Sequence, residues 1–289
     1  NGMLGSTLCR LYHNIHEVSA FHRDLECLTA YSESFSLQLM DTHQFELLFS
    51  QIKPDLVIHC AGLTSVDACD EEPELAYQAN VVVTENIAKA CSNETKLIYI
   101  STDQVYGKAA DHSEDNDDLQ PVNQYGKTKL LGEQKVRELC TDYIIVRTNI
   151  FGWNLKPGRI SSAEWIYRSL KKGEEITLFT DYTFSPVYTE CLGDIIMQLV
   201  DKDFSGVINA GSSTPCSKYD FGMQLAEEFG LNLSLIRKGS IVDYSFSAPR
   251  FHKLDFDVSK LSGLGIVPPG YRLSIRQFAQ GSKDRADHY

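Results

Sequence analysis

The sequence predicts an α/β protein built on a doubly wound parallel sheet, with a smaller second lobe. In the first half of the chain, short apolar runs rich in β-branched residues alternate with amphipathic stretches, which is the pattern of βαβ units. After Arg147 this alternation loosens, and Gly152, Pro157 and Gly158 mark a break. The 289 residues are enough for one large domain or two closely packed ones.

The first half is predicted as strands and helices in alternation. The runs with strand character are His16 to His22, Ser36 to Met40, Asp55 to Cys60, Lys96 to Ser101 and Tyr143 to Arg147. The amphipathic stretches predicted as helices are Leu4 to Tyr12, Thr42 to Gln51, Pro73 to Cys91 and Val122 to Cys140. Thr42 and Glu72 stand at positions that are typical of helix starts.

The second half predicts a lobe that interleaves with the first. Helices are expected at Ile160 to Lys172, Thr189 to Asp201 and Lys218 to Phe229. Gly206 to Ala210 is apolar enough for a buried strand that returns to the main sheet. We therefore assign residues 1–150 and about 189–210 to the first domain, and residues 151–188 and 211–289 to a smaller, interleaved C-terminal lobe.

The composition excludes several classes of partner. There are 27 Lys and Arg against 39 Asp and Glu, and a formal net charge of -12 repels nucleic acid and anionic lipid. No apolar run approaches the ~18 residues of a membrane span, and the start shows no secretory signal pattern. The eight cysteines include no CxxC pair. We therefore expect reduced thiols, no metal site, no nucleic acid or membrane partner, and a cytoplasmic protein.

The chain opens with two glycines at a helix start. Gly2-Met3-Leu4-Gly5 leads directly into an amphipathic stretch, and such a loop lets backbone approach a pyrophosphate at the helix N-terminus. Taken alone, two glycines at a helix start mark a tight turn more often than a cofactor loop. The strands expected after it are those of a dinucleotide-binding fold, so the context favours a cofactor loop.

A Tyr and a Lys stand four residues apart in the predicted helix from Val122. Tyr125 and Lys129 therefore share one helix face. Thr102 directly follows a strand, and α/β folds bind ligands at the carboxyl ends of their strands. Together the three form a proton-transfer device: Lys129 would lower the phenol pKa from about 10, Tyr125 would donate its proton, and Thr102 would orient the substrate oxygen.

These motifs resemble the extended short-chain dehydrogenase/reductases, which have a Rossmann fold. Within them, the chain is similar to the dTDP-4-dehydrorhamnose reductase group, and the likeness covers nearly the whole chain. The residues that carry it are Gly2-x-x-Gly5, Lys53 to His59, Cys60-Ala61-Gly62, Thr64-x-Val66-Asp67, Asn80, Ser101 to Gly107, Asn123 to Glu133, Arg147-Thr148, Ser185-Pro186-x-Tyr188, Arg250 and Phe256 to Leu261.

The resemblance implies roles for matching positions. Asn80 would complete a catalytic tetrad with Thr102, Tyr125 and Lys129, holding Lys129 through a water, while Lys129 also grips the nicotinamide ribose. The implied cofactor-binding residues are Gly2, Met3, Leu4, Gly5, Asp41, Ala61, Gly62 and Lys129, with Asp41 near the adenine. The alternative for Asp41 is that it caps the helix beside it.

Substrate contacts are expected at Thr64, Thr102, Asp103, Tyr125, Asn149 and Arg250. Arg250 is a forked donor suited to a diphosphate. A surface ion pair with a nearby carboxylate is an equally open interpretation. The C-terminal lobe, which carries Arg250, is expected to bind the substrate and to choose the sugar and nucleotide.

The sequence also departs from the family pattern. The family's glycine loop has a further glycine before Gly2, preceded by a central strand, so we expect the chain to lack roughly ten or more N-terminal residues. Sugar-nucleotide dehydratases have Glu where Gln104 stands, and an amide cannot act as the base. Asn149-Ile150, Phe251 and Leu254 differ from the rhamnose-forming enzymes, which leaves the sugar open.

We therefore predict an NADP(H)-dependent enzyme that reduces the 4-keto group of a nucleotide-linked deoxysugar, with NAD possible. In an NAD enzyme, an acidic residue near the end of the second strand would bind the ribose 2′-hydroxyl, and the sequence there is His22-Arg23. Arg23 suits the 2′-phosphate of NADP. The alternative is that Arg23 is simply an exposed residue at a loop start. One alternative is a cofactor-binding regulatory subunit similar to the β subunit of methionine adenosyltransferase. Another is a sugar-nucleotide epimerase. A homodimer is possible.

Overall fold

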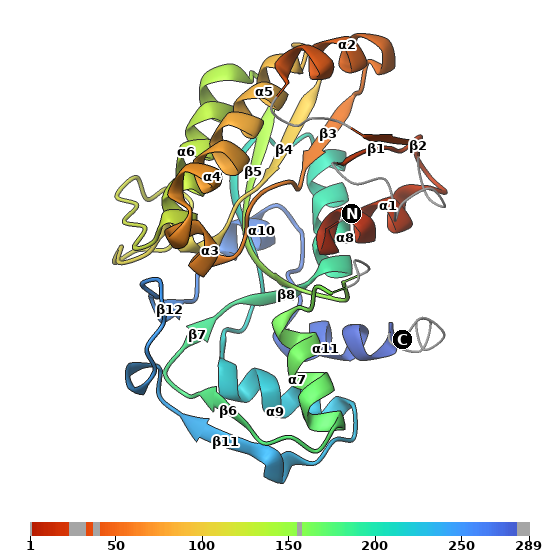
Figure 1. Cartoon of the computed structure of the whole chain (residues 1–289). Coiled ribbons are helices and arrows are strands. Elements are labelled where there is room, and N and C mark those ends of the chain that lie inside the picture. The colour runs from red at the N-terminus through yellow and green to blue at the C-terminus, as the bar shows by residue number, and fades with distance from the viewer. Residues whose placement is uncertain (1, 23–32, 37–40, 155–157, 282–289) are drawn as a thin grey trace.

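The computed structural model describes residues 2–22, 33–36, 41–154 and 158–281, which form two lobes (Figure 1). The main sheet of the upper lobe is parallel and has the order β3, β4, β5, β9. Its strands are β3 (Leu56–His59), β4 (Lys96–Ile100), β5 (Tyr143–Phe151) and β9 (Gly206–Ala210). A separate parallel pair is formed by β1 (Ser19–His22) and β2 (Glu33–Ser36).

Helices cover both faces of the main sheet (Figure 1). The side chain of Ile98 on β4 packs into the same cluster as residues of α1 and α8, whereas its neighbours Leu97 and Tyr99 pack with residues of α2, α5 and α6. Successive strand residues point to opposite faces, so both faces are buried and the predicted doubly wound fold is confirmed. The upper-lobe helices are α1 (Met3–Tyr12), α2 (Thr42–Ile52), α3 (Val66–Glu71), α4 (Pro73–Tyr77), α5 (Val83–Ala90), α6 (Gln124–Leu139) and α8 (Thr189–Asp201).

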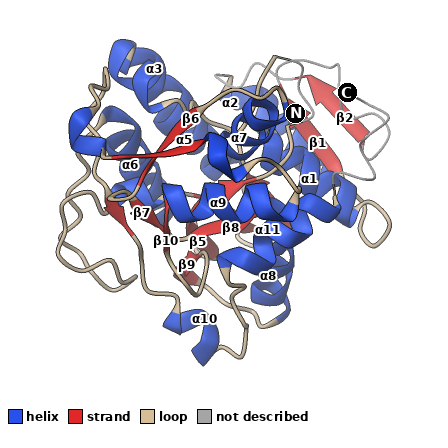
Figure 2. Cartoon of the chain, turned by 90° about the horizontal axis from the view of Figure 1, so that it is seen from below, coloured by secondary structure: helices blue, strands red, loops and turns tan. Residues whose placement is uncertain are grey.

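The lower lobe combines helices with small sheets. In it, β11 pairs with β6, and β7 lies between β10 and β12. Seen from below, α9 and α11 lie across this lobe (Figure 2). Its elements are α7 (Ser162–Lys171), β6 (Ile176–Phe179), β7 (Thr183–Phe184), β8 (Pro186–Tyr188), β10 (Cys216–Ser217), α9 (Lys218–Glu228), β11 (Ile236–Gly239), β12 (Lys253–Leu254) and α11 (Tyr271–Gln280). The short helix α10 (Ser259–Gly263) lies against β9 of the upper lobe (Figure 1).

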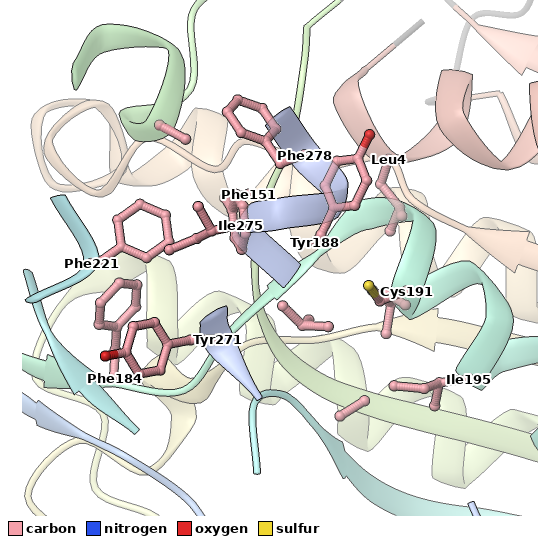
Figure 3. Packing of buried hydrophobic residues seen from close by; sticks show 14 of the residues in the cluster. Leu4, Phe151, Phe184, Tyr188, Cys191, Ile195, Phe221, Tyr271, Ile275 and Phe278 are labelled. Carbon is pink, nitrogen blue, oxygen red and sulfur yellow. The ribbon is translucent and has the colours of Figure 1, made fainter. Parts of the chain in front are cut away.

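One hydrophobic cluster joins the two lobes (Figure 3). Phe151, at the end of β5, contacts the rings of Tyr188, Phe221 and Phe278 with centroid separations of 5.9, 4.9 and 5.6 Å. Leu4 of α1 belongs to the same cluster. The last residues of β5 therefore connect the sheet of the upper lobe to the aromatic core of the lower one.

Three elements differ from the prediction by more than a shift of their ends. β5 extends to Phe151 and pairs there with β8, so a strand crosses the boundary placed at residue 150. The helix predicted from Pro73 to Cys91 is broken by a π-helical turn over Gln78–Val82. The strand predicted from Ser36 to Met40 is found at Glu33–Ser36, and residues 37–40 lie outside the described residues.

The described cysteines, seven of the eight, are free thiols. Within residues 2–22, 33–36, 41–154 and 158–281, no cluster of His, Cys, Asp and Glu is arranged to hold a metal ion. In the same residues, every helix is too short or too polar to cross a membrane.

Candidate active site

Tyr125 and Thr102 meet where β4 ends and α6 begins. The side chain of Asn123 caps α6 by accepting from the Gly126 N–H at 2.9 Å, which fixes the first turn that carries Tyr125. Thr102 follows β4, and its Oγ1 accepts from the Gln104 N–H at 3.2 Å. Burial raises the pKa of Tyr125 well above its usual value, and its hydrogen bond with Thr102 opposes this rise. The predicted hydroxyl and phenol are therefore side by side.

Lys129 is buried one turn further along α6. Its Nζ lies 3.9 Å from the centroid of the Tyr99 ring. Burial lowers the pKa of Lys129 to about 7, and the charge of Glu133 opposes this change. Burial is the largest cause of the raised pKa of Tyr125. The lowering of the phenol pKa by Lys129 stays a prediction.

Asp103 connects two other predicted substrate-binding residues, Thr102 and Asn149. Its Oδ1 accepts from Thr102 Oγ1 at 3.0 Å, and its Oδ2 accepts from Asn149 Nδ2. Gln104 Nε2 approaches Oδ1 at 3.5 Å. The side chain is 1% exposed. Burial raises the pKa of Asp103, while the bonds from Asn149 and Thr102 and the charge of Lys218 lower it.

Two residues of the lower lobe reach this network and were missed by sequence reasoning. The hydroxyl of Tyr182 is hydrogen-bonded to Gln104. Burial lowers the pKa of Lys218 to about 8, and the charge of Asp103 opposes this change. The sequence held one feature that could have singled out Lys218. It directly follows the helix cap Ser217, where the helix dipole disfavours a cation.

Asn80 lies in the π-helical turn and binds the loop that follows β3. Its Oδ1 accepts from the Leu63 N–H at 2.8 Å, and its Nδ2 donates to Leu63 O at 3.1 Å and to Thr128 Oγ1 at 3.0 Å. A Cβ on Gly62 would stand 2.7 Å from Asn80 Oδ1, so only glycine fits there. Asn80 thus fixes the loop of Ala61 and Gly62, and its link to Lys129 through a water stays a prediction.

The start of α1 fits an anionic group. Gly2 caps the helix without a side-chain hydrogen bond, and the first turn carries no acidic side chain. The backbone N–H groups of a first turn have no partner within the helix, so Met3, Leu4 and Gly5 could offer theirs to a pyrophosphate. The Leu4 side chain itself is buried in the core.

The other predicted cofactor residues receive less support. Asp41 caps α2, with Oδ1 accepting from the N–H groups of His43 and Gln44 at 3.0 and 3.4 Å. The capping interpretation is therefore confirmed, and a role near the adenine stays a prediction. Arg23 lies outside the described residues. Thr64 is exposed, on the loop before α3.

Arg250 forms the ion pair that the sequence left open. Its Nη2 lies 2.6 Å from Asp67 Oδ2 of α3, which joins the two lobes. Its Nη1 is buried and has no hydrogen-bond partner among the described residues. Arg250 also borders a cavity of about 590 Å³, lined by Lys108, Gln120, Pro121, Val122, Pro249 and Arg250. One half of the guanidinium is thus used structurally, and the other half is buried without a hydrogen-bond partner among the described residues.

The chain is similar to reductases over most of its length. It is 30% identical over 275 residues to the "probable low-salt glycan biosynthesis reductase Agl14" of Haloferax volcanii, covering 93% of this chain and 91% of that protein. It is 27% identical over 250 residues to the methionine adenosyltransferase 2 subunit beta of Xenopus laevis, covering 83% of this chain and 74% of that protein.

A solved structure and a family model agree with this similarity. The dTDP-4-dehydrorhamnose reductase of Bacillus anthracis, solved in complex with NADP, superposes with a TM-score of 0.82 at 26% identity, covering 97% of this chain and 96% of that one. The model of the RmlD substrate binding domain matches residues 1–283. The resemblance inferred from the motifs is thereby confirmed, and the chain belongs to the RmlD substrate-binding-domain family.

Proposed function

We propose that the protein reduces the 4-keto group of a nucleotide-linked deoxysugar with NADP(H). The observation that carries this proposal is the placement of Thr102, after β4, beside Tyr125, in the first turn of α6, one helical turn from the buried Lys129. When bound, the reduced cofactor supplies a hydride to the carbonyl carbon. Tyr125 then gives its phenolic proton to the carbonyl oxygen, and the phenolate is reprotonated from solvent.

The predicted enzyme class, an NAD(P)-dependent oxidoreductase, is confirmed by a reductase among the relatives and by a solved reductase that holds NADP. The choice of cofactor and the residues that bind cofactor and sugar are part of the proposal. We assign the cofactor to the start of α1 and the loop of Ala61 and Gly62, with Lys129 at the nicotinamide ribose, and the sugar to Thr102, Asp103 and Asn149. NADP is preferred, and NAD is possible.

A panel of nucleotide-linked 4-keto-6-deoxy sugars tests the proposal. Each sugar would be incubated with NADPH or NADH, and the loss of reduced cofactor would be followed by absorbance and the product by mass spectrometry. We expect turnover of at least one 4-keto sugar, with NADPH preferred. Absence of any reduction with either cofactor would contradict the proposal.

A regulatory subunit is the second candidate, because a methionine adenosyltransferase β subunit is among the relatives. Such a subunit binds a partner enzyme and needs no turnover of its own. Purification with methionine adenosyltransferase, without reduction of any keto sugar, would favour this second function.

We predict that replacing Arg250 with Ala weakens substrate binding more than catalysis. Loss of a charged hydrogen bond costs about 1.5–3 kcal/mol, so the Michaelis constant for the sugar nucleotide should rise about ten-fold or more, with cofactor affinity unchanged. Steady-state kinetics and calorimetry measure the two quantities. Arg237→Ala is the matched control, because Arg237 pairs with Glu175 on an exposed part of the same lobe. Loss of cofactor binding, or no kinetic change in Arg250→Ala, would remove Arg250 from the substrate site.

We also predict that the protein does not dehydrate sugar nucleotides. The side chain of Gln104 accepts from Asn123 Nδ2 at 3.2 Å and is hydrogen-bonded to Tyr182, so this amide is part of a hydrogen-bond network at the place of the elimination base. An amide has no proton to exchange at neutral pH. Incubation with a nucleotide-linked glucose and NAD should give no 4-keto-6-deoxy product in mass spectra, and a clear product peak would contradict this expectation.

A further inference from the structure

His59 is a buried titratable residue that the proposed reaction does not use. It is the last residue of β3, just before the loop that contains Ala61. Its Nε2 lies 2.9 Å from Oγ1 of Thr84, which is buried in α5. The centroid of its ring lies 5.4 Å from that of Tyr99. Burial lowers the pKa of His59 to about 3, and the charge of Lys129 acts in the same direction. The imidazole is therefore neutral at neutral pH, with one ring nitrogen as donor and the other as acceptor.

The hydroxyl proton of Thr84 fixes the direction of this contact. Thr84 Oγ1 donates to Asn80 O at 2.7 Å, and a carbonyl oxygen can only accept. The single hydroxyl proton of Thr84 is therefore used, and its oxygen accepts from His59 Nε2. The hydroxyl of Tyr99 is hydrogen-bonded to Thr84 as well. Two buried side chains thus converge on a hydroxyl whose proton is directed at the main chain of Asn80.

Asn80 lies in an unusual helical turn. Over Gln78–Val82 the helix is π-helical, and single π-helical turns are rare and frequent at functional sites. The hydroxyl of Thr84 adds a side-chain hydrogen bond to the carbonyl four residues earlier in this turn. A Cβ on Gly132 of α6 would stand 2.9 Å from the same carbonyl oxygen, so α6 packs closely against it. The main chain of Asn80 is therefore held from α5 and from α6.

The amide of Asn80 connects the loop after β3 with α6. It makes two hydrogen bonds with the main chain of Leu63, at 2.8 and 3.1 Å, and donates a third to Thr128 Oγ1 at 3.0 Å. Thr128 stands directly before Lys129 on α6. Asn has a short side chain, so a shift of its main chain would displace the amide from all three bonds.

We propose that Thr84 and His59 are positioning residues of the active site, which fix the π-helical turn that carries Asn80. The hydrogen bonds run from His59 Nε2 to Thr84 Oγ1 and from Thr84 Oγ1 to Asn80 O. Through Asn80 they hold the loop of Ala61 and Gly62 to which we assign the cofactor, so this inference rests on the proposed function. Both side chains act through Asn80 and not on the reacting atoms, so their effect should appear in cofactor binding more than in proton transfer.

Amide hydrogen exchange tests this role without cofactor or substrate. The N–H of Leu63 donates to Asn80 Oδ1, and its exchange with solvent deuterium would be followed by NMR in the folded protein. Thr84→Val keeps the shape of the side chain and removes the hydroxyl. We expect Leu63 to exchange about five- to ten-fold faster in this variant, as for one lost hydrogen bond. Thr84→Ser keeps the hydroxyl and should restore most of the protection.

His59→Phe is the second variant. It keeps an aromatic ring beside Tyr99 and removes the Nε2 donor, so the hydroxyl of Thr84 loses one of its partners. Leu63 should exchange about two- to five-fold faster, a smaller effect than in Thr84→Val because the bond to Asn80 O remains. If Thr84→Val does not fold, the exchange rate in His59→Phe decides the question.

Thr95→Val is the matched control. Thr95 is also a buried threonine with a hydroxyl bonded to a carbonyl group, because its Oγ1 donates to Pro54 O at 2.9 Å. It stands directly before β4, at the end of the sheet opposite to the loop of Ala61, and its replacement should leave Leu63 exchange unchanged. Unchanged exchange in the folded Thr84→Val and His59→Phe variants, a Thr84→Ser variant as fast as Thr84→Val, or an equal effect in Thr95→Val would overturn the proposal.

Calorimetry with NADPH adds the link to the active site. The cofactor should bind about five- to ten-fold more weakly to Thr84→Val and nearly as tightly to Thr84→Ser as to the parent. With a 4-keto sugar nucleotide that the parent reduces, kcat at saturating cofactor should change less than cofactor affinity, because the loop binds the cofactor alike in the ground and transition states. Faster Leu63 exchange with unchanged cofactor affinity would overturn the active-site role of Thr84. Absence of cofactor binding in the parent would instead refute the proposed function, and Leu63 exchange would still decide whether Thr84 and His59 fix the loop.

Discussion

Replacing Tyr125 with Phe is expected to reduce turnover of the keto sugar by about 100-fold or more, which is typical for loss of a general acid. The phenol is the proton donor in the proposed reaction, and the ring alone keeps the packing at the start of α6. Burial raises the pKa of Tyr125, so the phenol holds its proton throughout the neutral range. The loss should therefore appear in kcat at every pH between about 6 and 8, far below the usual phenol pKa of about 10.

The control for this variant is Tyr77→Phe. Tyr77 is 41% exposed at the end of α4, so its hydroxyl should have no part in turnover. Affinity for the reduced cofactor, measured by calorimetry, should be unchanged in both variants. Reduction by Tyr125→Phe at the parental rate would show that another group supplies the proton.

Replacing Glu133 with Gln is expected to lower the free energy of unfolding by about 3–5 kcal/mol, the usual cost of removing one partner from a buried ion pair. Arg147 and Glu133 are 0% and 1% exposed. Arg147 Nη2 and Nε donate to Glu133 at 2.8 and 3.1 Å, and Ser101 Oγ donates to it at 2.6 Å. The variant leaves the guanidinium of Arg147 buried without its counter-charge.

Urea unfolding followed by circular dichroism measures this loss. Glu138→Gln is the matched control on the same helix, because Glu138 pairs with Lys135 at the surface, and exposed pairs add little to stability. A midpoint for Glu133→Gln equal to that of the control would mean that the buried pair is not needed to hold α6 on the sheet.

The sequence predicts those parts of the fold that depend on local pattern. The short apolar runs of β4 and β9, each flanked by amphipathic stretches, are enough to place both strands in a buried parallel sheet. The π-helical turn at Asn80 was not predictable, because helical periodicity is nearly the same on both sides of it. The extension of β5 was missed because its last residues pair with β8, about 40 positions later in the chain, and strand pairing at that distance leaves no local signal.

The candidate site also contains residues that a local pattern predicts and residues that it does not. Thr102, Asp103 and Tyr125 follow from motif spacing and from the edge of the sheet at which they stand. Tyr182 and Lys218 were missed because they come from the other lobe, about 80 to 115 residues further along the chain. The ion pair of Arg250 was one of two interpretations that the sequence left open, and its partner Asp67 follows only from the packing of the lobes.

The path of β5 limits how this molecule can move. The strand pairs with β4 and β9 along most of its length and with β8 at its end, and Phe151 there contacts the aromatic rings of the lower lobe. A rigid-body hinge between the lobes would have to bend this strand and open the shared core. A swing of one lobe against the other is therefore disfavoured. For the same reason the two lobes should melt together as one cooperative unit.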